Sequence, residues 1–128
     1  MTRILIADDS PFIREQLRGL LENKGVEVIE ARNGEEALTK SERVKPDLIV
    51  LDCQMPVMDG LQAARQLRAA MPRVPVAMFA LDASPYLAEV AKKIGIKALF
   101  PKTRFFQLLN WIETQIRIGS GSHAREAA

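Results

Sequence analysis

The residues best suited to chemistry are charged side chains that directly follow short apolar runs. Asp8 and Asp9 follow residues 4–7, Asp52 follows the run LIVL, and Lys102 comes after the run KALF, in the stretch LFPKT. Two neighbouring carboxylates repel each other and resist burial, so a pair at the end of a core segment needs a positive partner. A hard divalent cation is one such partner, because Mg²⁺ is held by a few carboxylates together with water and phosphate oxygens.

The elements that must position these residues are strands and helices in alternation. Short apolar runs at 3–7, 26–31, 48–51, 76–80 and 97–100 predict five strands, and three of these runs barely alternate, which indicates burial on both faces. Five such βα units imply a parallel sheet with helices on both faces. The predicted fold is therefore α/β, a three-layer flavodoxin-like (βα)5 sandwich. Right-handed crossovers leave few topologies, and sheet order 2-1-3-4-5 is a common one.

Helix start signals separate the predicted strands. Ser10 precedes Pro11 and Ser84 precedes Pro85, which is the usual order of an N-cap followed by proline at the first helical position. Asn33 lies three residues before a glutamate, as in a capping box, and another helix is expected to start near residues 59–60. A last helix over residues 105–116 carries an apolar stripe on one face.

The charged residues should meet at one place. Ligands of open α/β sheets bind beyond the carboxyl ends of the strands, and these ends carry Asp8, Asp9, Asp52, Asp82 and Lys102. A single aspartate in such a place is usually a helix cap or a turn residue. The joint placement instead predicts a site where a metal and the lysine stabilise a phosphoryl group passing to a carboxylate.

Composition narrows the class of protein. The 128 residues suit one domain, and a net charge of +2 argues against nucleic-acid binding by this segment. The single cysteine, Cys53, allows no internal disulfide, and neither a signal peptide nor a membrane span is seen, so we expect a cytoplasmic protein. Residues 119–128 (GSGSHAREAA) are expected to form a flexible tail, the start of a linker or an expression scar, with His123 idle in it.

At this point the sequence resembles a response-regulator receiver domain of the two-component, chemotaxis-regulator-like type. The segments ILIADDS, PDLIVLDCQMPVMDGLQAAR and GIKALFPKT follow the family's order and spacing. The resemblance covers residues 2 to about 118, so we expect a receiver domain over 1–118. In that family the domain is a signalling module and not an enzyme.

The resemblance implies a role for each residue of the predicted site. Asp52 would accept the phosphoryl group. Asp9 and Asp52 would bind Mg²⁺ together with the backbone carbonyl of Gln54, and Asp8 would act on the metal through water or by orienting its neighbours. Lys102 would contact the phosphoryl group.

The resemblance also implies partners. A sensor histidine kinase, a phosphotransfer protein or a small donor such as acetyl phosphate would supply the phosphate. The face formed by residues 85–94, 97–100 and 105–118 would carry output or a homodimer contact. Nucleic acid would be reached only through a separate output domain.

The chain departs from the family at its switch positions. Ala80 stands where a Thr or Ser usually binds the phosphoryl group, and a lost hydrogen bond to a charged group costs about 1.5–3 kcal/mol. Leu99 replaces a usually aromatic residue, and Phe100 cannot substitute because strand side chains alternate faces. The usual Lys-Pro pair becomes Lys102-Thr103, for which we expect a trans peptide bond.

These observations leave several hypotheses open. The first is a phosphorylatable receiver with an atypical switch, and the second is a pseudo-receiver that acts as a phosphorylation-independent interaction module. A flavodoxin-like nucleotide binder or a haloacid-dehalogenase-type phosphatase is a third, although the adjacent acids and the missing Gly-rich loop argue against it. Gln54 would tune the phosphoryl lifetime or be a solvated loop residue, and Asp82 would repel the phosphoryl group or cap the following helix.

Overall fold

A single parallel sheet of five strands forms the centre of the molecule. The computed structural model describes the backbone of residues 1–127 and the side chains of residues 1–118. The strands are β1 (Arg3–Ala7), β2 (Glu27–Ala31), β3 (Leu48–Asp52), β4 (Val76–Ala80) and β5 (Ala98–Pro101). Their order in the sheet is β2-β1-β3-β4-β5 with every pair parallel, which confirms the predicted α/β flavodoxin-like topology.

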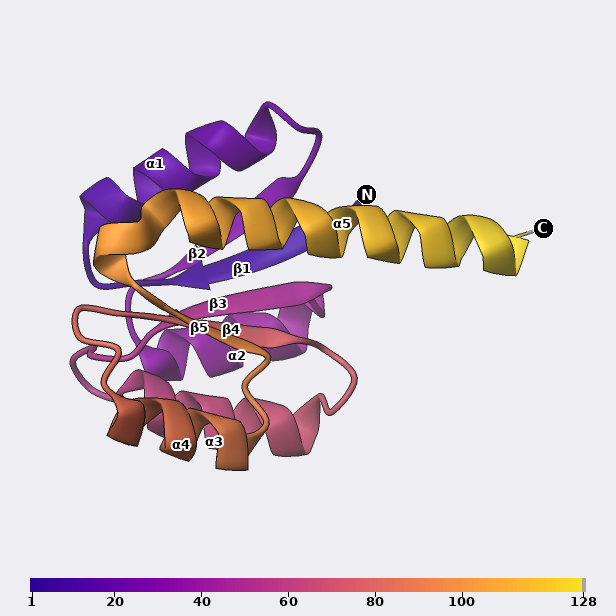
Figure 1. The fold of residues 1–128 in the computed structure, drawn as a ribbon. Helices are drawn as coiled ribbons and strands as arrows, with labels where there is room; N and C mark the ends of the chain where they lie inside the picture. Colours follow the sequence, from indigo (N-terminus) through magenta and orange to yellow (C-terminus); the bar gives the residue numbers. More distant parts are fainter. Residues whose placement is uncertain (128) are drawn as a thin grey trace.

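Helices cover both faces of this sheet. They are α1 (Pro11–Glu22), α2 (Gly34–Val44), α3 (Gly60–Ala70), α4 (Pro85–Ile94) and α5 (Phe105–Ala127), with a short 3-10 turn η1 (Lys102–Arg104) before α5. Figure 1 shows α1 and α5 on one side of the sheet and α2, α3 and α4 on the other. Two separate cores result, because β1, β3 and β4 bury side chains on both faces.

The predicted helix starts are confirmed as side-chain caps. Ser10, Asn33 and Ser84 accept hydrogen bonds from backbone N–H groups in the first turns of α1, α2 and α4, and Asp59 does the same for α3. A capping side chain typically contributes about 1 kcal/mol. Since every helix follows a strand, these caps lie at the carboxyl edge of the sheet.

A few boundaries differ from the prediction. Asp52 is the last residue of β3 and not the first after it, and β5 extends to Pro101. The helical backbone of α5 continues to Ala127, past the predicted end of the domain at 118. Side chains 119–128, with His123, lie outside the described residues, so the predicted tail stays a prediction. No helix in the described part of the chain is both long and apolar enough to span a membrane.

Gly60 ties the start of α3 to the end of β3. Its backbone N–H donates to the carbonyl of Cys53 at 2.9 Å. A Cβ at this position would lie 2.1 Å from the backbone carbonyl oxygen of Asp52, far inside van der Waals contact. Only glycine therefore allows the loop of residues 53–59 to close, and this closure holds Asp52 at the end of its strand.

Two glycine-to-alanine substitutions should have opposite effects. Gly60→Ala should lower the free energy of unfolding by about 2–3 kcal/mol, because backbone must move to make room. Gly19→Ala is the matched control: Gly19 lies inside α1 with nothing within 4 Å of its Cβ position, so it should gain about 0.5–1 kcal/mol. Urea denaturation followed by circular dichroism measures both, and a neutral Gly60→Ala would contradict the role given to this contact.

Candidate functional site

Lys102 joins two buried carboxylates from different strands. Its Nζ atom lies 3.1 Å from Oδ2 of Asp8 and 3.1 Å from Oδ2 of Asp52. Asp8 and Asp52 are 2% and 3% exposed, at the ends of the neighbouring strands β1 and β3. Lys102 follows β5, so its side chain crosses the end of β4, where its Nζ lies 6.0 Å from the centre of the Phe79 ring. The structure thus brings together residues from distant parts of the chain, since Asp8 and Lys102 are 94 positions apart.

Short-range hydrogen bonds orient both carboxylates. Oδ1 of Asp8 accepts from the backbone N–H of Ser10 at 2.9 Å, and the carbonyl of Asp8 accepts from the guanidinium of Arg14 at 2.6 Å. Oδ1 of Asp52 accepts from the backbone N–H of Gln54 at 3.3 Å. One oxygen of each carboxylate is therefore held by the following loop and the other by Lys102.

A third carboxylate completes an acidic cluster. Asp9 is exposed, and one carboxylate oxygen from each of Asp8, Asp9 and Asp52 lies within 4.8 Å of the other two. Ligand oxygens around one octahedral Mg²⁺ are about 3–4 Å apart, so small side-chain rotations would let all three reach one ion. The donors are all oxygen, which suits a hard cation. With Lys102 the cluster carries a formal charge of −2, which one Mg²⁺ would neutralise.

The electrostatics of the site act in opposite directions on Asp52 and Lys102. Burial raises the pKa of Asp52 to about 6, and the charge of Asp8 adds to this effect, while Lys102 opposes it. Burial works to lower the pKa of Lys102, but its hydrogen bond to Asp8 and the charges of Asp8 and Asp52 outweigh burial, so that pKa is raised. Lys102 is therefore a permanent cation, and Asp52 is a carboxylate whose proton affinity is unusually high.

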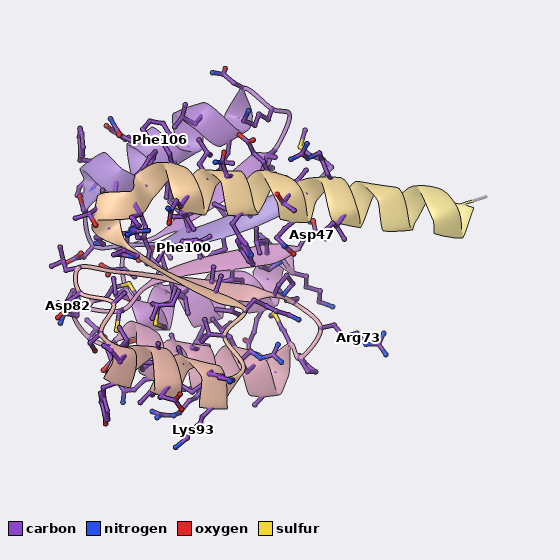
Figure 2. The ribbon with its side chains drawn as sticks, viewed as in Figure 1. Asp47, Arg73, Asp82, Lys93, Phe100 and Phe106 are labelled. Carbon is purple, nitrogen blue, oxygen red and sulfur yellow. The ribbon has the colours of Figure 1, made fainter. Side chains whose placement is uncertain are left out.

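The flanking residues occupy the expected places. Gln54 is exposed two residues after Asp52, and Asp82 is exposed after β4. Figure 2 shows Asp82 at the end of the sheet toward which the strands point, opposite Asp47 and Arg73. Ser84 and not Asp82 caps α4, so the alternative that Asp82 serves as the cap is wrong.

The two predicted switch positions, Ala80 and Leu99, lie on β4 and β5. Ala80 ends β4 and is buried. Because its side chain is a methyl group, this position offers no hydroxyl. Leu99 packs with the core on the α3 and α4 side. Phe100 faces the other way and packs against Trp111 of α5, with ring centres 6.2 Å apart. The peptide bond between Lys102 and Thr103 is trans, as expected, since no cis bond occurs in the described residues.

The sequence analysis missed a group of exposed apolar side chains in the loops and helix starts at the carboxyl edge of the sheet, the edge that also carries the acidic cluster. We define the apolar rim as Phe12, Val57, Leu81, Tyr86 and Phe106, which are 64–79% exposed. Its three aromatic residues are each the second residue of a helix that starts at the carboxyl edge of the sheet. Val57 belongs to the loop after Asp52 and has a φ of 69°, a value that β-branched residues rarely adopt. An aromatic residue at the second position of three predicted helices was the sequence pattern that could have indicated this rim.

Comparison with known families agrees with this geometry. The family model described as response regulator receiver domain matches residues 4–112. The chemotaxis protein CheY of Listeria monocytogenes is 38% identical over 103 residues, which cover 80% of this chain and 87% of that protein. A protein-glutamate methylesterase/protein-glutamine glutaminase of Hahella chejuensis is 51% identical over 70 residues, which are 54% of this chain. The matched segment is only 20% of that enzyme's length.

Solved structures show the same fold. A chemotaxis protein of Vibrio cholerae aligns with a TM-score of 0.82 and 30% identity, covering 89% of this chain and 98% of that chain. The response regulator TrrA of Thermotoga maritima, solved in complex with Mg²⁺-BeF, aligns with a TM-score of 0.80 and 31% identity. That alignment covers 90% of this chain and 99% of that one.

The raised pKa of Asp52 predicts a specific dependence of stability on pH without metal. In the unfolded chain this carboxyl has a pKa of 3.8, against about 6 in the folded protein. The folded state then binds more protons between these values, so this contribution to stability is present below about pH 4 and is lost as the pH rises through about 6. Asp52→Asn should therefore become more stable relative to the parent from about pH 4 to 7, by ~1–3 kcal/mol.

Urea denaturation in the presence of a chelator measures this difference. Asp59→Asn is the control, because Asp59 is exposed and asparagine caps a helix equally well. A difference between parent and Asp52→Asn that stays constant from about pH 4 to 7 would contradict the assignment.

Proposed function

Because this chain belongs to the family of response regulator receiver domains, we propose that Asp52 accepts a phosphoryl group and that the domain changes an interaction surface in response. The observation that carries this proposal is the contact of Lys102 with both Asp8 and Asp52. A lysine held by a second carboxylate is in place before any phosphoryl group arrives. It therefore needs only a short shift from Oδ2 of Asp52 to an oxygen of the incoming group.

The acidic cluster fits Mg²⁺ as the cofactor. Asp8, Asp9 and Asp52 would hold the ion directly or through water, and the backbone carbonyl of Gln54 would add a ligand beside its N–H bond to Asp52. When bound, Mg²⁺ withdraws negative charge from the phosphoryl oxygens. The Mg²⁺-BeF complex of the Thermotoga relative supports this assignment.

In the transfer, the protein mainly positions the reacting groups and stabilises their charge. A carboxylate oxygen of Asp52 forms the new bond to phosphorus, and the bond from phosphorus to the donor's nitrogen or oxygen breaks, with the electron pair leaving on the donor. Lys102 neutralises charge on the phosphoryl oxygens during this step. Asp8 keeps Lys102 oriented and takes no part in bond formation.

A pseudo-receiver is the second candidate, and the methyl side chain of Ala80 favours it. Without a hydroxyl, the phosphorylated state lacks one hydrogen bond. Such a bond would contribute about 1.5–3 kcal/mol to the free-energy difference between the inactive and active forms. That amounts to roughly a tenfold to hundredfold weaker population shift. Leu99 has no aromatic ring that could change position together with such a shift. If the domain is a phosphorylatable receiver, we therefore expect its output to be atypical.

The apolar rim supports a protein as the phosphate donor. Aromatic residues are enriched where proteins bind one another and often supply much of the binding energy. Phe12, Tyr86 and Phe106 lie at the starts of helices that follow strands, at the same edge of the sheet as Asp52, and a donor would approach Asp52 from this edge. A sensor histidine kinase or phosphotransfer protein therefore fits better than a small donor alone.

The homodimer contact, the bounds of the domain and its location in the cell belong to the same proposal. A homodimer through α4, β5 and α5 would use Ile118, which is 58% exposed, whereas Trp111 is partly buried against Phe100 and offers less surface. The receiver would span residues 1–118, with nucleic acid reached only through a separate output domain. The single cysteine favours the cytoplasm as its location.

Phosphorylation of Asp52 is directly testable. With acetyl phosphate and Mg²⁺, mass spectrometry should find one phosphoryl group on Asp52, and none in Asp52→Asn. Asp9→Asn should weaken Mg²⁺ binding at least tenfold, measured as the Mg²⁺-dependent rise in melting temperature. Asp59→Asn, a carboxylate lost from the same loop, should leave both within twofold. No adduct and no stabilisation by Mg²⁺ would favour the pseudo-receiver.

The rim predicts a difference between donors. The double variant Phe12→Ala/Phe106→Ala should slow phosphoryl transfer from a phosphorylated histidine kinase at least tenfold, because each aromatic anchor contributes about 1–2 kcal/mol of docking energy. Its reaction with acetyl phosphate should stay within twofold of the parent. Ile118→Ala, which removes an exposed side chain far from the rim, is the control. Equal slowing with both donors would show that the rim shapes Asp52 and does not dock a protein.

A further inference from the structure

The segment that contains α3 and α4 carries an excess of positive charge, and its Arg65 and Lys93 lie on the surface between the two helices. Residues 60–97 contain six Lys or Arg and two acidic residues, a net charge of +4, so the rest of the chain sums to −2. The six are Arg65, Arg68, Arg73, Lys92, Lys93 and Lys97. Among the described side chains none of the six forms an ion pair, whereas Arg14, Arg18 and Lys40 each contact a glutamate.

A hollow on this face combines cations with apolar side chains. It measures about 410 Å³ and is lined by Arg65 of α3 and by Val90, Lys93 and Ile94 of α4. Figure 2 shows Lys93 on the side of α4 that faces away from the sheet. Figure 2 shows Asp82 at the end of the sheet toward which the strands point. The other acid of the segment, Glu89, directly precedes Val90 of the hollow.

Interaction with helix dipoles accounts for some of these cations but does not account for Arg65 in the hollow. Arg68, Lys92 and Lys93 lie in the last turns of their helices, where cations offset the negative end of the dipole. Arg65 lies a turn earlier and gains nothing from that effect. The side chain of Arg68 points inward to the carbonyls of Pro72 and Val74, and its Nε donor has no partner.

We propose that this cationic hollow, lined by Arg65, Val90, Lys93 and Ile94, binds an acidic amphipathic helix of a partner protein. The carboxylates of such a helix would pair with Arg65 and Lys93, and its apolar side chains would cover Val90 and Ile94. The surface is separate from the apolar rim and from the acidic cluster. It therefore provides contact with a second partner while the phosphate donor occupies the rim.

The lining favours a protein over nucleic acid as the ligand. No aromatic side chain lines the hollow, so bases would find no stacking platform. Two of its four residues are aliphatic, which an acidic helix can cover and a phosphate backbone cannot. The overall charge of +2 is also small for a protein that tracks a polyanion.

A labelled synthetic helical peptide that presents Glu and Leu on one face is the probe for this surface. Fluorescence anisotropy should show binding to the parent that weakens with added salt. Arg65→Glu/Lys93→Glu should raise Kd at least tenfold, and Val90→Ser several-fold. The matched control, Arg43→Glu/Arg117→Glu, makes the same change of charge at two exposed cations that form no ion pair in the described chain and lie outside the hollow. It should change Kd less than twofold.

The alternatives give distinct results. No binding of the acidic peptide, or equal weakening by both double variants, would overturn the proposal. So would tighter binding of a DNA duplex or of vesicles with anionic lipids, or a dimer in sedimentation that Arg65→Glu/Lys93→Glu dissolves. Phosphorylation by acetyl phosphate should be unchanged in that double variant, so failure here is distinguishable from failure of Asp52 as the acceptor.

Discussion

The contact of one lysine with two buried carboxylates is the interaction on which the site depends. Asp8 and Asp52 lie on neighbouring strands, and without Lys102 their charges would face each other with little solvent between them. Breaking such a buried arrangement by removing one partner typically costs several kcal/mol. The cluster still carries an excess of two negative charges when Asp9 is included. This imbalance favours a divalent ion. Burial, together with the neighbouring charge of Asp8, raises the pKa of Asp52.

The fold supports this contact through close packing of the backbone. Strands buried on both faces bring the ends of β1, β3 and β5 to one edge, and the helix caps fix where each following loop turns. Gly60 lets α3 start against the carbonyl of Asp52, which keeps Asp52 at the edge of the sheet. The rigidity of this edge contrasts with the exposed aromatic residues around it, which are free to contact a partner.

Our proposals assign different kinds of recognition to different surfaces of the molecule. The acidic cluster suits a cation and a phosphoryl group, the apolar rim suits a protein donor, and the hollow between α3 and α4 suits an acidic helix. Ala80 and Leu99 remove the polar and aromatic groups that usually join the site to the α4 side. Phe79, by contrast, lies beneath Lys102 and packs against Phe105 at the start of α5. A response to the proposed phosphorylation would therefore not use a hydroxyl at residue 80.

The sequence by itself determined the sheet, its order and the identity of the site residues. Apolar runs, caps and prolines are local signals, and Asp8, Asp9, Asp52 and Lys102 each stand at a strand end that those signals locate. It also showed that Ala80 and Leu99 depart from the family pattern. Only the tertiary structure decided that one lysine spans two carboxylates and that three aromatic residues share a rim. It alone placed Arg65 beside Lys93 and left both unpaired. Such contacts join distant segments and depend on side-chain reach and burial, which no local pattern encodes.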